Sequence, residues 1–323
     1  MRRIFGKTKL QINLKVVEHG NRESLIYELV IEELIIYLRE KYEVPNPCRF
    51  LPIPEYFKTL KSSENPEYTN FKMIITKNVK YSGYQALDAK GLDYEHSVVA
   101  LAALARLHTI SYCYQKEKKT NLKAQYTVLE RSPVHLITRE TVFQVFKQHP
   151  QFHLYSHLFL GQENILLDIQ EDFETFGVLC HGNHFEESLM FKYTTDDDED
   201  KPSDAVFKNL ENCYFGSCVP DLLHFIFSYI NQDTRRNFLL YFIGNVYFEA
   251  FKSAVLSINK NIPMFSKLEI SAEIKKFAVS CGFSALEIGL KQQKLERRKS
   301  LNDQENILAT FRDVLKITNS VNV

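Results

Sequence analysis

The stretch from Val178 to Tyr193 places polar residues between two short apolar runs. The runs are Val178–Cys180 and Leu189–Phe191, and the residues between them begin with His181 and Gly182. Apolar runs bounded by polar turn residues predict strand, loop and strand. A histidine and a glycine at the end of a strand indicate a candidate site, whereas the alternative is a surface hairpin with an incidental histidine.

A second candidate is a pair of opposite charges near the N-terminus. Lys15 lies in the alternating stretch Leu10–Val17, where Leu14 and Val16 share one face and Lys15 points to the other, as in a strand with one buried face. The following segment, Glu23–Lys41, has apolar residues at helical spacing. A lysine on the strand and a glutamate on the helix could form an ion pair; alternatively, both side chains are solvated.

The composition is that of a soluble globular protein. Of the 323 residues, 45% are hydrophobic and 25% are charged, and 40 basic residues balance 40 acidic ones. No global field therefore favours nucleic acid or an anionic membrane, and we expect neither as a partner. The basic N-terminus lacks the apolar core of a signal peptide. The apolar segment Phe238–Phe251 is too short and too polar to span a bilayer, which favours a buried helix.

The cysteines predict reduced thiols in a cytoplasmic protein, because they form no CxxC pair and the chain is too large to need disulfides. They are Cys48, Cys113, Cys180, Cys213, Cys218 and Cys281. Cys213 and Cys218 lie five residues apart, but no histidine accompanies them at ligand spacing, so no metal site is predicted.

The elements that would position these residues divide the chain in two. Strand, helix and strand, the last at Phe71–Ile75, fill residues 1–80, and residues 81–323 are mostly helical with one β-hairpin at 178–210. The predicted helices are Tyr94–Tyr114, capped by Asp93, then Ser132–Lys147, His153–Ile169, Leu222–Ile230, Arg235–Val255, Leu268–Cys281, ended by Gly282, and Asn302–Ile317. A small α/β lobe on a larger helical lobe commonly binds a ligand in the cleft between them.

Three segments resemble the ecdysteroid-kinase-like (CHK-type) family, insect-centred relatives of choline and aminoglycoside kinases. They are the helix Lys90–Tyr112, the stretch Val178–Tyr193 and the segment Asn209–Phe227. The second resembles the family's catalytic loop, usually His-Gly-Asp, four residues and Asn. The third resembles a segment that usually opens Asp-Phe-Gln and leads through Gly-Ser to an Asp-Leu helix start. The resemblance implies an α+β, two-lobed, protein-kinase-like fold.

The resemblance also implies phosphoryl transfer from ATP with Mg²⁺, in which a strand lysine paired to a helix glutamate positions the phosphates. Carried over residue by residue, Lys15 falls on the nucleotide-positioning lysine and Glu33 on its helix partner. His181 and Gly182 match the entry of the catalytic loop, and Asp221 matches the acidic residue that opens the helix bracing the loop.

The positions that would carry the chemistry depart from the family's pattern. Asn183 stands where the base Asp belongs, Ser188 where the Mg²⁺-binding Asn belongs, and Asn209 where the other Mg²⁺-binding Asp belongs. A neutral amide cannot take a proton near neutral pH and is a poor ligand for a hard dication. Loss of the base alone would cost roughly 10²–10⁴-fold in rate. ATP and Mg²⁺ are therefore implied by the resemblance alone.

The resemblance further implies two strands and a Gly-containing phosphate-covering loop upstream of Lys15. Only fourteen residues precede Lys15, and Gly6 alone cannot replace that loop. The N-terminal lobe is accordingly expected to be truncated, either because the protein lost the loop or because the gene model is incomplete.

Three hypotheses follow. The first is a pseudokinase that keeps the fold and binds a small hydroxylated or steroid-like molecule, or a protein partner. The second is a working ATP-dependent kinase of a small-molecule hydroxyl, in which Glu186, Glu187 or Glu211 supplies the missing carboxylate. The third is a gene product without a selected function.

Overall fold

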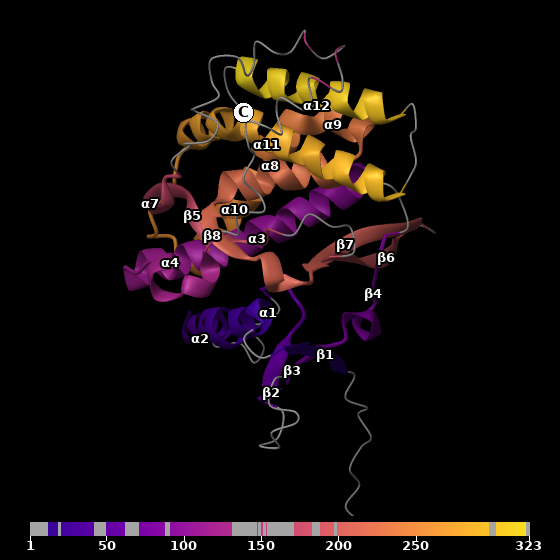
Figure 1. Ribbon diagram of the computed structural model, residues 1–323. Coiled ribbons are helices and arrows are strands. Elements are labelled where there is room, and N and C mark those ends of the chain that lie inside the picture. The colour runs from indigo at the N-terminus through magenta and orange to yellow at the C-terminus, as the bar shows by residue number, and fades with distance from the viewer. Residues whose placement is uncertain are drawn as a thin grey trace, which may run out of the picture.

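The fold of the chain is α+β, with a small N-terminal part and a larger, mostly helical C-terminal part (Figure 1). The computed structural model describes residues 12–18, 21–41, 50–61, 71–87, 91–130, 147, 150, 153, 171–182, 188–196, 199–296 and 302–320. The predicted helices Ser132–Lys147 and His153–Ile169 lie, apart from a few isolated residues, outside this set.

The N-terminal part is a three-stranded antiparallel sheet with a helix against one face (Figure 1). Its strands are β1 (Ile12–Glu18), β2 (Tyr56–Lys61) and β3 (Phe71–Lys77), and β3 lies in the centre. The helix runs without a break through α1 (Arg22–Leu25), the π-helical η1 (Ile26–Ile31) and α2 (Glu32–Lys41). Asn21 starts it, because its side chain accepts from the N–H groups of Glu23 and Ser24.

The side chains of β1 alternate as predicted, but the buried face is the opposite one. Leu14 and Val16 are 50% and 62% exposed, whereas Val17 is buried in the core, and Lys15 lies on the same side as Val17. Alternation distinguishes the two faces of a strand, but it does not say which of them a helix will cover. Here the helix covers the side that carries Lys15, so the lysine points into the molecule.

Helix α3 (Tyr94–Lys118) is the central element of the C-terminal part (Figure 1). The side chain of Asp93 starts it by accepting from the N–H of His96 at 3.0 Å, as predicted. Its small residues Ala100, Ala103 and Ala105 are completely buried, which lets several elements approach its backbone closely. In the sequence, the short helix η3 (Val79–Ser82) precedes α3, and the short helices α4 (Leu122–Gln125), η4 (Thr127–Leu129) and α7 (Phe173–Phe176) follow it.

The strands of the C-terminal part form two small antiparallel sheets. One has the order β4 (Tyr84–Gln85), β6 (Leu189–Asp196), β7 (Glu199–Phe207), and the other pairs β5 (Gly177–Cys180) with β8 (Tyr214–Ser217). The predicted hairpin is therefore formed by β6 and β7. Both apolar runs form strands, as predicted, but they do not pair with each other: the first lies in β5, which pairs with β8, and the second lies in β6, which pairs with β7.

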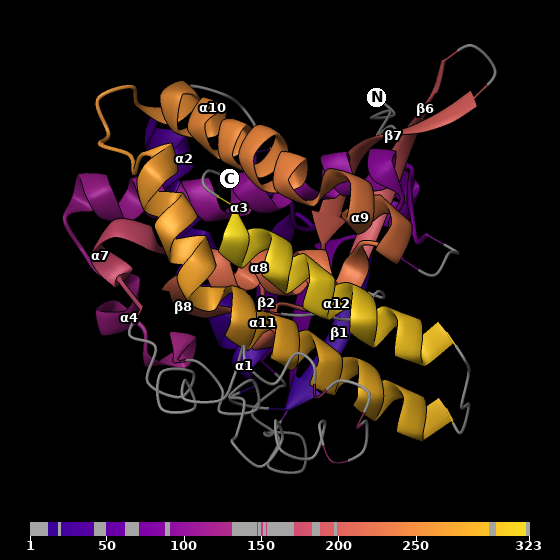
Figure 2. The same ribbon diagram turned by 90° about the horizontal axis from the view of Figure 1, so that it is seen from above.

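The described residues after β8 are mainly helical, as predicted, and Figure 2 labels the helices α8 to α12. They are α8 (Cys218–Tyr229), α9 (Gln232–Tyr241), the π-helical η9 (Phe242–Tyr247), α10 (Phe248–Ile258), α11 (Lys267–Glu296) and α12 (Asn302–Asn319). Gly282 does not end a helix, since α11 continues through it. A Cβ atom on Gly282 would lie 2.5 Å from Cγ2 of Val314, so this glycine lets α11 and α12 approach each other closely.

The run Gln232–Ile258 is long and apolar enough to cross a membrane by length and composition alone. Half of its most apolar window is buried inside the protein, and the core helix of a soluble protein passes the same test. Phe242, Tyr247 and Phe251 of this run are completely buried in the core, as predicted for a buried helix.

One core joins the two parts of the chain. Leu34 and Tyr37 of α2 belong to the same buried cluster as Leu104 and Ile110 of α3. The rings of Tyr37 and Tyr114 meet edge to face with centroids 5.5 Å apart. Helix α2 therefore packs directly on α3 and connects the N-terminal sheet to the helical part.

Candidate functional site

Asp221, in the first turn of α8, holds the segment that follows β5. Its carboxylate accepts from the backbone N–H groups of His181 at 2.8 Å and Gly182 at 2.9 Å. The aspartate is 2% exposed, and a buried carboxylate of this kind is stable only when its oxygens are hydrogen-bonded. Asp221 therefore fixes the backbone at the entry to the predicted catalytic loop.

His108 of α3 braces this aspartate from the other side. Its Nε2 lies 3.0 Å from Oδ2 of Asp221, and its Nδ1 lies 2.7 Å from the hydroxyl of Tyr247. A carboxylate can only accept, so Nε2 is the donor, and Nδ1 of a neutral imidazole accepts a hydrogen bond from the Tyr247 hydroxyl. Burial raises the pKa of the Tyr247 phenol well above its ordinary value, so this hydroxyl stays protonated. The arrangement fits a His108 whose Nε2–H donates to the carboxylate.

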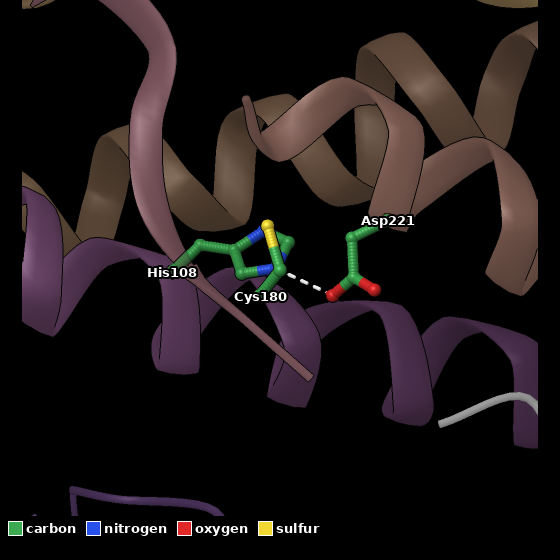
Figure 3. A group of neighbouring side chains, drawn as sticks. All are labelled: His108, Cys180 and Asp221. Atoms are coloured by element: carbon green, nitrogen blue, oxygen red, sulfur yellow. Dashed lines mark hydrogen bonds and ion pairs between the residues drawn. The ribbon is translucent and has the colours of Figure 1, made fainter. Parts of the chain in front are cut away.

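Cys180 lies beside His108 and Asp221, and the three offer ligand atoms within 4.8 Å of one another (Figure 3). Metal binding would require a thiolate at this position. Burial, followed by the nearby Asp221 carboxylate, raises the pKa of the Cys180 thiol well above its ordinary value. The thiol donates instead to the carbonyl of Ser217, with Sγ 3.4 Å from the oxygen. The hydrogen bonds of this cluster fit a structural brace rather than a metal centre.

His181 and Gly182 bring the loop entry against the segment before η8 (Leu210–Asn212). The Nε2–H of His181 donates to the carbonyl of Lys208 at 2.9 Å, and the imidazole packs on Phe207. Gly182 has φ +66°, and a Cβ atom there would lie 2.3 Å from the carbonyl oxygen of Asn212. The glycine is therefore required both by its backbone conformation and by the close approach of η8.

Two of the three departures from the family's pattern lie next to each other. The amide nitrogen Nδ2 of Asn209 donates to Oγ of Ser188 at 3.4 Å, and the N–H of Lys208 donates to the Ser188 carbonyl at 2.7 Å. Asn209 adopts the left-handed conformation, φ 59° and ψ 67°, which Asn tolerates better than most residues. Asn183, at the position of the base, lies outside the described residues.

Lys15 contacts two carboxylates from different parts of the chain. Its ammonium lies 2.5 Å from Oε2 of Glu23 in α1 and 3.2 Å from Oε2 of Glu211 in η8. The side chain of Glu23 is 4% exposed, whereas those of Lys15 and Glu211 are 40% and 44% exposed. Partial burial lowers the pKa of the lysine, but the two carboxylates raise it by more, so it lies above its ordinary value. Lys15 remains cationic over the physiological range.

The predicted ion pair of Lys15 with Glu33 is therefore wrong. Glu33 accepts instead from the hydroxyl of Tyr114 on α3 at 3.0 Å. Glu23 stands in the first helical turn, only a short connection away from the end of β1. Glu33 lies nearly three turns further along the same helix, where α2 packs on α3, and it points away from β1 toward the helical part.

Glu23 also joins α1 to η8. Its second oxygen, Oε1, accepts from the N–H of Leu210 at 3.1 Å. The neighbouring guanidinium of Arg22 donates through Nη2 to the carbonyl of Cys213 at 2.7 Å. Two side chains in α1 therefore hold η8 through backbone atoms: Glu23 contacts its first residue, Leu210, and Arg22 contacts Cys213, which follows its last residue. Leu210 comes directly after Asn209, so Asn209 is fixed next to this contact.

Sequence reasoning missed Glu23, Arg22 and the role of His108 as a partner of Asp221. A local signal for Glu23 existed, because Asn21 at the cap position predicts that the helix begins just before it. No local signal marked Arg22, whose partner Cys213 is 191 residues away. Glu211 was considered only as a substitute carboxylate, and the structure places it on Lys15.

Comparison with known proteins gives one family and several solved structures. The model of the ecdysteroid kinase-like family matches residues 4–260. No curated protein matches the sequence. Among solved structures, the amicoumacin kinase hAmiN is similar with a TM-score of 0.46 and 12% identity, over 95% of this chain and 83% of that chain.

Two further structures are similar at the same level. A choline/ethanolamine kinase family protein from Mesorhizobium loti gives a TM-score of 0.40 and 12% identity, over 96% of this chain and 83% of that one. The choline kinase LicA from Streptococcus pneumoniae gives 0.40 and 10% identity, over 96% and 87%.

The family match spans the sheet with Lys15, the braced loop after β5 and the whole of α8. The small sheet-and-helix lobe and the larger helical lobe are those of a two-lobed, protein-kinase-like fold, which confirms the fold that the sequence motifs imply. The chain belongs to the ecdysteroid kinase-like family.

Proposed function

We propose that this kinase-like protein is a pseudokinase, which keeps the framework of the phosphotransfer site but lacks or has severely impaired phosphotransferase activity. The framework consists of the Asp221 brace under the loop and of Lys15 paired with Glu23. Both are intact. Departures stand at the positions that the family's pattern gives to the base and to the two metal ligands.

The observation that carries this proposal is the contact of Asn209 with Ser188. Two side chains that would hold Mg²⁺ in the family's pattern are an amide and a hydroxyl, and the amide nitrogen donates to the hydroxyl oxygen. Both side chains are neutral, and the Asn209 nitrogen that faces Ser188 is a donor that cannot bind a cation. The pair therefore supplies no carboxylate for Mg²⁺, which prefers charged oxygen ligands.

Glu211 favours one alternative, an active ATP-dependent kinase of a small-molecule hydroxyl. Its carboxylate lies two residues after Asn209 and reaches the ammonium of Lys15 at 3.2 Å. A carboxylate at this place could bind a cation that bridges to the phosphates, replacing the aspartate expected at Asn209. The other two candidate carboxylates, Glu186 and Glu187, lie outside the described residues.

The ligand class follows from the family and is part of the proposal. A small hydroxylated or steroid-like molecule, or a protein partner, would bind to the helical lobe of a protein located in the cytoplasm. Without a working base, such a protein would bind its ligand and release it unchanged.

Phosphoryl transfer from ATP tests the proposal directly. The full-length protein is incubated with ATP, Mg²⁺ and a panel of hydroxylated small molecules that includes an ecdysteroid, and the phosphorylated product is measured. We expect no product above a protein-free control. Turnover at ordinary kinase rates, about 1–100 s⁻¹, that is lost in Asn183→Ala would contradict the pseudokinase proposal. Turnover that survives Asn183→Ala but is lost in Glu211→Gln would favour the alternative.

A further inference from the structure

We propose that Glu211 determines the ligand specificity of the site, because its carboxylate neutralises Lys15 and so disfavours ligands that carry phosphate. This inference rests on the part of the proposed function in which the framework around Lys15 is kept. It adds a property that the substituted catalytic positions do not explain, namely the charge of the ligands that the site binds preferentially.

The charges around Lys15 support this inference. One ammonium lies between two carboxylates, Glu23 at 2.5 Å and Glu211 at 3.2 Å. The three side chains together carry one net negative charge. A phosphate group that approaches Lys15 must either displace Glu211 or join an arrangement that is already negative, and both cost free energy.

Only one of the two carboxylates is in a position to respond to a ligand. Glu23 is 4% exposed and also accepts from the N–H of Leu210, so it is fixed in place by two partners. Glu211 is 44% exposed and Lys15 is 40% exposed, so both of these side chains reach the solvent. A ligand therefore meets Glu211 before it meets the buried carboxylate.

The position of Glu211 does not depend on its own charge. The segment around it is held on α1 by the contact of Glu23 with the Leu210 N–H and by the contact of Arg22 with the Cys213 carbonyl. Both contacts use backbone atoms of the segment. The substitution Glu211→Gln should accordingly keep η8 in place and remove one negative charge from the ammonium of Lys15.

The test compares ATP with adenosine, which shares the base and ribose but lacks the phosphates. Both are titrated by calorimetry without Mg²⁺ into the wild-type protein and into Glu211→Gln. We expect the variant to bind ATP roughly 2- to 5-fold more tightly, the change expected for one half-exposed ion pair, and to bind adenosine unchanged. The gain should shrink at high salt, because exposed charges are screened.

Two further variants separate the charge of Glu211 from other effects. Glu40→Gln removes a carboxylate of similar exposure, 53% against 44% for Glu211, that pairs with Lys118 on α3, and it should leave ATP binding unchanged. In the Lys15→Met background, Glu211→Gln should lose its effect on ATP, because the cation through which Glu211 acts is absent.

Three results would overturn the inference. The first is an ATP affinity that Glu211→Gln leaves unchanged, which includes the absence of ATP binding in both proteins. The second is an equal increase in the affinity for adenosine. The third is an increase in ATP affinity that is just as large in the Lys15→Met background. Each is distinguishable from a failure of the pseudokinase proposal, which is decided by phosphorylated product and not by affinity. A protein that turns over ATP could still show the effect of Glu211, and an inactive one could lack it.

Discussion

Gly182 illustrates how strongly single residues constrain the loop after β5. Its φ of +66° lies in the left-handed region, and the carbonyl oxygen of Asn212 occupies the place where a Cβ atom would stand, at 2.3 Å. Its N–H donates to Asp221. The left-handed φ and the close approach of Asn212 both require glycine at this position, whereas Gly83 has only the first requirement, with φ +86° and no atom closer than 3.8 Å to a Cβ atom.

We predict that Gly182→Ala destabilises the protein more than Gly83→Ala. Both substitutions place an alanine in the left-handed region, at a cost of about 1–3 kcal/mol each. Only Gly182→Ala adds a clash with a backbone oxygen that cannot move without disturbing η8. Urea unfolding of the two variants and the wild type measures the difference. Equal losses would mean that the approach of Asn212 to the loop is not as close as described.

Glu273 of α11 is a buried carboxylate outside the candidate site. It is 6% exposed, and its Oε1 has no hydrogen-bond partner within the part of the chain that the structure describes. Lys276 approaches its other oxygen at 3.4 Å, and Ser217 and Asp172 also face it. Burial raises the pKa of Glu273 above its ordinary value of 4.5, and the lysine offsets only part of that increase.

This shift makes the stability depend on pH with a definite sign. Because the folded protein binds the proton of Glu273 more tightly than the unfolded chain, the contribution of this group is fully present below pH 4.5 and is lost as the pH rises through its folded pKa. Glu273→Gln imitates the protonated form. We therefore predict that it raises the free energy of unfolding at pH 7 and that the gain disappears near pH 4.

Urea unfolding at the two pH values measures this prediction, with Glu95→Gln on the exposed first turn of α3 as the control. The control should change stability by less than about 0.5 kcal/mol at pH 7. A Glu273→Gln variant that is less stable than the wild type at pH 7 would contradict the burial argument.

Among the elements, α11 and α12 show that a glycine in a helix can serve packing. The sequence favours Gly282 as a helix end, yet it lies inside α11 at the place where Val314 of α12 comes closest. In an exposed helix, Gly→Ala would gain about 1 kcal/mol. Here we predict a net loss, because overpacking costs about 1–3 kcal/mol and outweighs that gain.

The double variant Gly282→Ala/Val314→Ala tests whether the clash is the cause. Val314 is 2% exposed, so Val314→Ala alone should also destabilise the protein by leaving a cavity. In the double variant the new methyl group fills part of that space, and the combined loss should be smaller than the sum of the two single losses. Additive losses would show that the two positions are not in contact.

The types of the elements were predictable from the sequence to a greater extent than their pairing. Periodic apolar residues predicted β1, β3, α3, α8 and the helices that follow, because burial repeats along each element. Strand pairing depends on contacts between distant residues, such as Val178 with Gly216, and no local pattern carries that information. For this reason the partner of β5 was missed.

The sequence predicted the site residues whose positions the motifs specify. It did not predict which of several similar residues in one helix would contact Lys15, because that depends on the three-dimensional packing. Asp221 and Gly182 lie together, as the motifs imply. The helix offers several glutamates to Lys15, and the choice of Glu23 over Glu33 depends on how the helix crosses β1. The π-helical η1 between these two glutamates shifts the helical phase, which the apolar spacing did not reveal.

At the scale of the whole molecule, α8 connects the site to the C-terminal helices. Its first turn holds the loop through Asp221, and its last carbonyls, Phe227 and Ile230, accept from Arg235, which forms a buried ion pair with Asp313 of α12 at 2.9 Å. The family match ends at residue 260, before α11 and α12. Helix α11 nevertheless packs on α8, the helix that braces the candidate site, and α12 packs on α11 and α9.

The Mg²⁺ dependence of ATP binding tests the central claim, that the site keeps its framework but has lost its metal ligands. ATP is titrated by calorimetry into the wild type and into Ser188→Asn/Asn209→Asp, each with Mg²⁺ and with EDTA. Because Mg²⁺ bound to ATP also lowers the negative charge of the ligand, the wild type serves as the reference for that effect. We predict that Mg²⁺ increases the affinity of the double variant more than that of the wild type, because only the double variant regains a carboxylate beside an amide. An equal effect of Mg²⁺ on the two proteins would contradict the claim.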